Sequence, residues 1–168
     1  MQRARRNTVR NIVIVISLGC CFIPSSSIAQ QAGQIDHYSA QDLKHKATEL
    51  QQKADNPAGA AAETLQKYGV DFTMLSVRTK DGGAEVHEQY SDLFIVIDGN
   101  ATLLSGGELE NSTSAAPGEM RGTAVLHGTR TTLSKGDVIH IPPGIPHQLL
   151  IPKGTVFSYF VVKVQEKP

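Results

Sequence analysis

Two histidines and two carboxylates are spaced so that they could hold a divalent metal ion. Glu85 and His87 share one face of an expected strand, because side chains along a strand alternate with period two. A bend near Tyr90 can return Asp92 to the same face. His147, from a later strand, would complete a set of two imidazoles and two carboxylates. Such a mixed nitrogen and oxygen set suits Zn²⁺, Mn²⁺, Fe²⁺ or Ni²⁺.

His147 follows a segment that has the pattern of a strand ending in a stiff turn. Residues 138–141 alternate as a pleated strand does. Pro142 and Pro143 then remove two backbone donors, and Gly144 can adopt a positive φ, so strand pairing must stop there. The sequence therefore places His147 just after a bend of predictable shape.

The spacing in this segment resembles the second sequence motif of the cupin family. The matching positions, with five, one and two residues between them, are Gly136, Pro142, Gly144 and His147. In cupins the last histidine of this motif is a metal ligand. The resemblance implies that role for His147 and a cupin barrel as the fold.

An upstream stretch resembles the first cupin motif. Asp92 lies seven residues before Gly99, which is the family's separation between its acidic ligand and the glycine that closes the motif. The family's two histidines lie five and seven positions before the acid, where this chain has His87 and Glu85. The resemblance therefore implies a metal-ligand set of Glu85, His87, Asp92 and His147.

This set departs from the usual cupin set of three histidines and one glutamate. The second carboxylate makes the site more anionic, and Asp92 has a shorter reach than a glutamate. Such a site could bind a hard cation through its charge, or it could be the incomplete cage of a member that has lost its metal. A simpler interpretation makes Glu85 and Asp92 solvated carboxylates at the barrel mouth, and leaves His147 to hydrogen-bond the backbone of the turn.

Polar residues near both motifs are candidates for substrate binding or proton transfer: Gln89, Tyr90 and His140. His140 alternates with Val138, so it faces either the barrel interior or the outer surface. Arg121 and His127 flank the stretch 106–121 between the motifs, which varies most among cupins and is expected to be a loop at the barrel mouth. They could meet an anionic ligand, although single loop side chains are commonly solvated.

From residue 71 onward the sequence predicts an all-β domain. Short β-forming runs are separated by Gly, Pro and Asn. Many short antiparallel strands with glycine-closed turns predict a closed barrel or a jelly roll. The resemblance implies the cupin-like double-stranded β-helix in particular. The expected strands cover residues 71–80, 84–89, 93–97, 101–105, 122–126, 129–133, 137–141, 148–151 and 155–164.

Two short α-helices are expected before the barrel. Ser39, with Asp42 three residues later, forms a start like a capping box. Apolar residues then recur at helical spacing as far as Pro57, which must end the helix. Residues 58–68 are interpreted as a second helix closed by Gly69. The predicted organisation is a signal peptide over residues 1–29, a polar tether and helical segment over 30–70, and the barrel over 71–168.

The first 29 residues have the pattern of a secretory signal peptide. Four arginines and no acid precede an apolar run that is too short to span a bilayer as a permanent helix. Ser27 and Ala29 provide the small residues of a cleavage site before Gln30. We therefore expect an exported protein, periplasmic or secreted, without stable membrane insertion. A lipid anchor on Cys21 is the alternative, because Leu18 fits one position of a lipobox.

Cleavage after residue 29 would change the charge balance of the chain. The whole sequence has 16 basic and 16 acidic residues, and loss of four arginines leaves 12 and 16, a net charge of about −4. This balance gives no reason to expect nucleic acid or an anionic membrane as a partner. Both cysteines would leave with the signal peptide, so neither a disulfide nor a thiolate ligand is expected. The remaining length, about 139 residues, suits one domain with a hydrophobic core.

These patterns support three hypotheses of function. The first is an exported cupin that binds a small polar molecule, with a divalent metal as an optional part of the site. The second is a metal-dependent cupin enzyme of isomerase, lyase or dioxygenase type acting on a small polar substrate. The third is a structural oligomer whose barrel interior is vestigial. A homodimer is expected, because apolar residues of the helices, such as Ala47 and Leu50, form a stripe that a small barrel would not fully cover.

Overall fold

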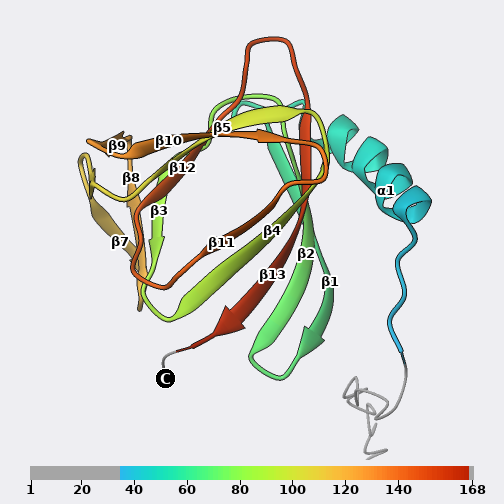
Figure 1. Cartoon of the computed structure of the whole chain (residues 1–168), viewed down its shortest axis with the longest axis horizontal. Coiled ribbons are helices and arrows are strands. Elements are labelled where there is room, and N and C mark those ends of the chain that lie inside the picture. The colour runs from blue at the N-terminus through green and yellow to red at the C-terminus, as the bar shows by residue number, and fades with distance from the viewer. Residues whose placement is uncertain (1–34, 167–168) are drawn as a thin grey trace, which may run out of the picture. The chain divides into compact units, whose positions relative to one another are not determined.

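Strands dominate the computed structural model, which describes residues 35–166. The helix and strands within that range follow one another in the order shown in Figure 1. Their bounds are α1 Ala40–Lys53, β1 Ala60–Tyr68, β2 Asp71–Arg78, β3 Ala84–His87, β4 Tyr90–Asp98, β5 Asn100–Ser105, β6 Glu108–Leu109, β7 Thr113–Ala116, β8 Glu119–Gly122, β9 Val125–Leu126, β10 Thr129–Ser134, β11 Val138–Ile141, β12 His147–Leu150 and β13 Phe157–Gln165.

Two antiparallel sheets make up the domain from His37 onward. The five-stranded sheet has the order β1-β2-β13-β4-β11, and the six-stranded sheet has the order β10-β5-β12-β3-β8-β7. The short strands β6 and β9 pair separately. Figure 1 shows the two sheets facing each other around a common interior. This arrangement confirms the predicted all-β, double-stranded β-helix or jelly-roll fold.

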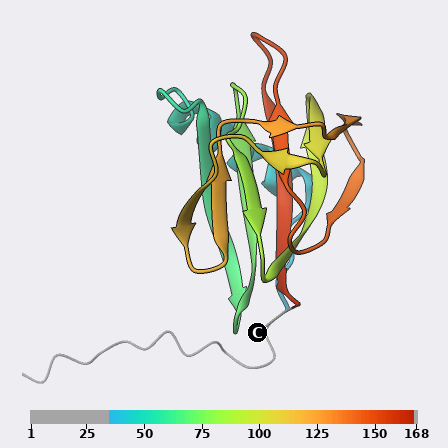
Figure 2. The same cartoon turned by 90° about the vertical axis from the view of Figure 1, so that its left-hand side faces the viewer.

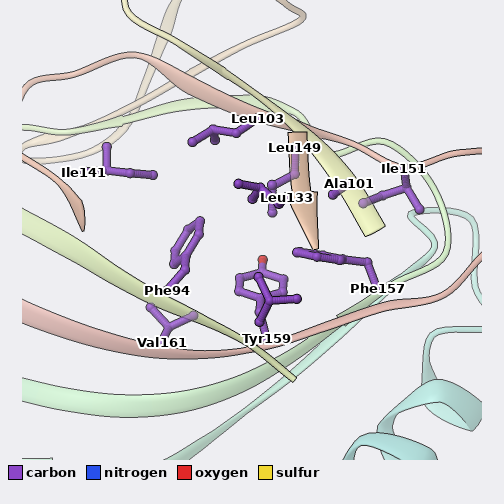
Figure 3. Close-up of a cluster of buried hydrophobic side chains, with 11 residues drawn as sticks. Phe94, Ala101, Leu103, Leu133, Ile141, Leu149, Ile151, Phe157, Tyr159 and Val161 are labelled. Carbon is purple, nitrogen blue, oxygen red and sulfur yellow. The ribbon is translucent and has the colours of Figure 1, made fainter. Parts of the chain in front are cut away.

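Alternate residues of each strand fill the interior between the sheets. Figure 3 shows Phe94, Tyr159 and Val161 facing a row of leucines from the opposite sheet. The Phe94 ring contacts the Tyr159 ring at a tilt of 56°, with ring centroids 4.9 Å apart. Because side chains alternate along a strand, the inward row of β13 continues beyond Val161 to Lys163. The rows that build the apolar core therefore end in polar residues toward one mouth of the barrel.

Helix α1 covers the outer face of the five-stranded sheet (Figure 1). Ser39 accepts a hydrogen bond from the Asp42 backbone N–H, and the Asp42 carboxylate accepts one from the Ser39 backbone N–H. This reciprocal pair confirms the expected capping box. Leu50 is buried among the outward-facing side chains of β2, which include Leu75 and Val77. The inward-facing residues of β2 therefore pack in the barrel interior, whereas its outward-facing residues pack against α1.

The second expected helix is wrong, because the segment forms strand β1. Residues of β1 pair antiparallel with β2, and Tyr68 lies opposite Asp71 across a tight turn. Gly69, with φ of 70°, supplies the left-handed conformation of that turn rather than a helix C-cap. The many Ala, Gln, Lys and Glu residues of β1 favour a helix locally, but pairing with β2 overrides that preference. The sheet therefore begins at Ala60, before the predicted boundary at residue 71.

The stretch 106–121 is also more ordered than the expected mouth loop. It contains β6, β7 and most of β8, and β8 pairs with β3. Figure 2 shows β7 and β8 as a hairpin at the edge of the barrel. The Ser, Thr, Ala and Gly residues there give little hydrophobic alternation, which is why the strands were not predicted.

No helix within residues 35–166 is long and apolar enough to cross a membrane. The expected signal peptide, with its cleavage site at Ala29 and the alternative lipidation site at Cys21, lies outside the described residues.

Replacing Leu50 by Ala should destabilise the domain by about 2 to 5 kcal/mol, because a buried methyl-rich side chain is lost between helix and sheet. Urea unfolding followed by circular dichroism would measure the change. Val138→Ala is the matched control, since Val138 is 62% exposed. If Leu50→Ala costs no more than the control, helix α1 is not packed as described.

Candidate metal centre

Strand pairing brings the four expected ligand residues to one place inside the barrel. Glu85 and His87 point inward from β3, and β12 pairs with β3 so that His147 lies opposite Glu85. Asp92 enters from β4 in the facing sheet. The turn before His147 is tied to β3, because the Gly144 N–H donates to the His87 carbonyl oxygen at 2.8 Å. Gly144 has the expected positive φ, 81°.

The imidazole nitrogens approach the carboxylates without hydrogen bonding to them. His147 Nε2 lies 3.4 Å from Glu85 Oε1 and 3.6 Å from Asp92 Oδ2. His87 Nε2 lies 3.6 Å from the same Asp92 oxygen and 3.9 Å from Glu85 Oε2. Within residues 35–166, neither Nε2 atom has a hydrogen-bond partner although both are buried. Orphaned buried nitrogens of this kind require an explanation.

The other ring nitrogen of each histidine fixes how the imidazole is presented. His147 Nδ1 lies 3.0 Å from the Ile145 carbonyl oxygen, and since a carbonyl can only accept, Nδ1 donates. His87 Nδ1 donates in the same way to Glu119 Oε2 at 2.7 Å. In the neutral form both Nε2 lone pairs therefore face the shared space. Metal-binding histidines are commonly held by such a hydrogen bond from the second nitrogen.

Three side chains fit a metal ion closely. One ligand atom each from Glu85, His87 and His147 lies within 4.8 Å of the other two. Metal–ligand bonds of about 2.0–2.2 Å place neighbouring ligand atoms about 3.0–3.5 Å apart, so the three groups would draw closer together around an ion. Two histidines and one carboxylate make a set that leaves coordination positions open, as in non-haem iron sites. The donor set therefore fits a divalent metal.

Asp92 differs from the other three because it is shared with a lysine. Lys163 lies opposite Asp92 in the pairing of β13 with β4, and its Nζ forms an ion pair with Asp92 Oδ1. Asp92 Oδ2 remains turned toward the two imidazoles. Asp92 thus adds negative charge beside the triad while one of its oxygens is held by an ammonium.

The carboxylates of the site are held in their ionised forms. Burial alone would raise the pKa of Glu85, but His147, His87 and Arg121 outweigh it and hold the pKa at about 2. Burial acts in the same direction on Asp92, whose pKa is lowered by His147 and Lys163. Both groups therefore carry negative charge at neutral pH.

The pKa values of the two histidines are shifted in opposite directions. Burial and the Lys163 ammonium lower the pKa of His87 despite the nearby carboxylates. Burial also acts to lower the pKa of His147, but Asp92 and Glu85 outweigh it and raise the pKa to about 9. Without another cation, a proton on His147 balances the two carboxylates. A metal ion that takes the site must displace this proton.

The cluster opens on a cavity of about 410 Å³ inside the barrel. This volume suits a small-molecule ligand. Apolar side chains such as Met74 and Phe94 form part of the wall, and charged groups are gathered beside the triad. The polar lining comprises Ser76, Arg78, Glu85, His87, Tyr90, Asp92, Glu119, Arg121, Tyr159 and Lys163.

The structure brings only part of the expected substrate-binding set to this cavity. Tyr90 lines it, and its hydroxyl donates to the Val70 carbonyl oxygen at 3.2 Å. Gln89 lies in the turn between β3 and β4 and is not among the residues lining the cavity. His140 is on the outer surface, 55% exposed and 3.6 Å from Glu166, so it does not belong to the site.

Arg121 and His127, which flank the stretch between the motifs, lie in different places. Arg121 lines the cavity and contacts Glu119 at 3.1 Å. His127 is 82% exposed and lies 3.4 Å from Glu108, away from the cavity lining. Only Arg121 is therefore placed to meet a ligand in the barrel.

Three charged residues of the site escaped the sequence analysis. Lys163 could have been found by continuing the period-two row that includes Tyr159 and Val161. Glu119 lies opposite His87 on β8, in a stretch that was expected to be a loop and was given no inward face. Arg78 follows the apolar run of β2, and nothing local in the sequence distinguishes it from a solvated strand end.

Solved structures with the same arrangement of strands support this description of the fold. A conserved protein with a double-stranded β-helix domain from Klebsiella pneumoniae matches with a TM-score of 0.53 and 15% identity, over 79% of this chain and 91% of that chain. A conserved protein of unknown function from Streptococcus pyogenes matches with a TM-score of 0.52 and 16% identity, over 80% and 93%. The chain has a cupin-like double-stranded β-helix fold.

The remaining comparisons do not identify a function. A cupin 2 conserved barrel domain protein from Salinispora arenicola matches at 21% identity, over 65% of this chain and 78% of that chain, with a TM-score of 0.46. No protein-family model matches the sequence, and no curated protein is significantly similar to it. At these identities the likeness concerns the fold, so the function must be argued from the site itself.

Replacing Glu119 by Gln should weaken metal binding about 10- to 100-fold, because His87 loses the charged acceptor that orients its ring. Calorimetric titration of Zn²⁺ into the purified protein would measure the affinity. Glu108→Gln is a matched control, since Glu108 faces a histidine on the surface instead. Equal affinities in the two variants would mean that Glu119 does not support a metal ligand.

Proposed function

We propose that this cupin binds a small polar molecule in its barrel cavity, beside a divalent metal held by Glu85, His87 and His147. The observation that carries the proposal is the pair of buried Nε2 atoms, which converge without hydrogen-bond partners within residues 35–166. They face the carboxylate of Glu85, and Glu85 and His87 line the barrel cavity. A structural histidine would be expected to use both nitrogens.

The surrounding residues support a bound cation through position and charge. Glu119 and the Ile145 carbonyl orient the two imidazoles, and Asp92 contributes a further negative charge. Lys163 restrains Asp92, which leaves three side chains as ligands and the remaining positions open. Zn²⁺, Mn²⁺, Fe²⁺ and Ni²⁺ all suit this donor set.

The second candidate function is a metal-dependent enzyme of isomerase, lyase or dioxygenase type. It is favoured by the three-ligand set, because the open positions allow a substrate in the cavity to reach the metal. When bound, a divalent ion supplies Lewis acidity toward a carbonyl or hydroxyl group, and iron in such a triad supports oxygen chemistry. Tyr90, Tyr159 and Lys163 line the cavity and are the groups placed for proton transfer.

Metal analysis of His147→Ala tests the proposed function. Protein purified without chelator or nickel resin should carry about one divalent ion per chain, and the variant should carry none while its circular dichroism spectrum is unchanged. His140→Ala is the matched control, because His140 lies on the outer surface. Titration of Mn²⁺ and Zn²⁺ into all three proteins gives the affinities. Unchanged affinity in His147→Ala would show that the motif serves only as a structural turn.

Export is a second part of the proposal, supported by the sequence pattern of residues 1–29. The mature chain should begin at Gln30 and be free in the periplasm or secreted. Intact-mass measurement of protein expressed with its full N-terminus would identify the first residue. A mass that corresponds to an acylated chain beginning at Cys21 would replace export as a free protein by a lipid anchor.

A further inference from the structure

Three cationic side chains line the barrel cavity, and only one of them lacks a carboxylate partner. Lys163 is paired with Asp92. Arg121 contacts Glu119 at 3.1 Å and Glu85 at 3.5 Å. Arg78, in contrast, forms no salt bridge in the part of the chain that the structure describes, although Glu85 is near enough to raise its pKa. A partly buried guanidinium that faces a cavity and has no carboxylate in direct contact is placed to receive an anion.

The head group of Arg78 is also held in position. Its Nε donates a hydrogen bond to the hydroxyl oxygen of Tyr159 at 3.3 Å. On another side it packs against Gly82, where an added Cβ would lie 3.0 Å from both Cζ and NH1. The Nε contact leaves the two terminal nitrogens available. A planar fork that is already oriented suits bidentate binding of a carboxylate.

Gly82 is a rigid support for this arrangement. Its N–H donates to the Leu149 carbonyl oxygen at 2.8 Å, and its carbonyl oxygen accepts from Gln148 Nε2 at 2.8 Å. Gly82 and Gln148 are both buried. The absence of a side chain at residue 82 therefore provides space that the Arg78 guanidinium uses.

The charges of the cavity wall point to the same class of ligand. Three carboxylates, those of Glu85, Asp92 and Glu119, face three cations, those of Arg78, Arg121 and Lys163. With neutral imidazoles this wall has no net charge. A divalent ion at the proposed metal site would leave an excess of about two positive charges, which a small anion would neutralise.

We propose that the cavity binds a small organic acid whose carboxylate pairs with Arg78 and whose other oxygen groups face the metal ion proposed to be held by Glu85, His87 and His147. The part of this inference that concerns the metal rests on the proposed function, whereas the part that concerns Arg78 rests on the contacts of Arg78 alone. Tyr159 supplies a hydroxyl beside the carboxylate position. The cavity volume of about 410 Å³ accommodates an acid of a few carbon atoms.

Titration calorimetry with succinate and with neutral succinamide, which has nearly the same shape, tests the charge requirement. Zinc-loaded protein should bind succinate, and succinamide should bind much more weakly. Arg78→Gln should weaken succinate binding about 10- to 150-fold, the range expected for loss of a charge-assisted contact, with zinc affinity unchanged. Arg130→Gln, on the exposed strand β10, is the control and should bind succinate as the wild type does.

Two further measurements apply if Arg78→Gln does not fold or if zinc does not bind. Gly82→Ala retains the arginine but displaces its head group, so it should also weaken succinate binding. Metal-free protein tests Arg78 independently of zinc. If the metal-free wild type binds succinate and metal-free Arg78→Gln does not, the inference is supported even if zinc does not bind. Equal binding of succinate and succinamide, equal binding by wild type and Arg78→Gln, or no succinate binding with or without zinc would overturn it.

Discussion

The register between β4 and β13 is the constraint on which both the core and the site depend. It sets Val161 opposite Phe94 and, two residues further along, Lys163 opposite Asp92. The first pair belongs to the hydrophobic core, and the second lies at the candidate metal centre. A slip of one residue would turn the whole inward row of β13 to the outside. Packing of the apolar residues therefore also specifies where the charges meet.

Burial of so many charges is tolerated because most of them have a counter-charge nearby. Removing carboxylates such as Glu85 and Asp92 from water is costly unless cations accompany them. Lys163 and Arg121 provide fixed positive charge, and His147 provides a position that either a proton or a metal ion can fill. The buried carboxylates of the site are thus balanced by nearby positive charge.

Local features of the sequence predicted the parts of the site that depend on local structure. The turn before His147 and the shared face of Glu85 and His87 follow from two prolines, a glycine and strand alternation, so they could be predicted. Lys163 and Glu119 become site residues only through pairing with strands far away in the sequence. Such pairings cannot be read from one sequence. The same limit explains β1, whose local helix preference is overridden by its partner strand.

The hydrogen bonds that hold Gly82 have a consequence for selectivity. Strand β12 carries His147 at its start, and its next two residues fix Gly82, which supports the Arg78 guanidinium. A single short segment of backbone therefore sets both the His147 imidazole and the glycine against which the Arg78 guanidinium packs. A shift of this segment would move both groups. The barrel would then select acids by the number of carbon atoms between their two oxygen-bearing ends.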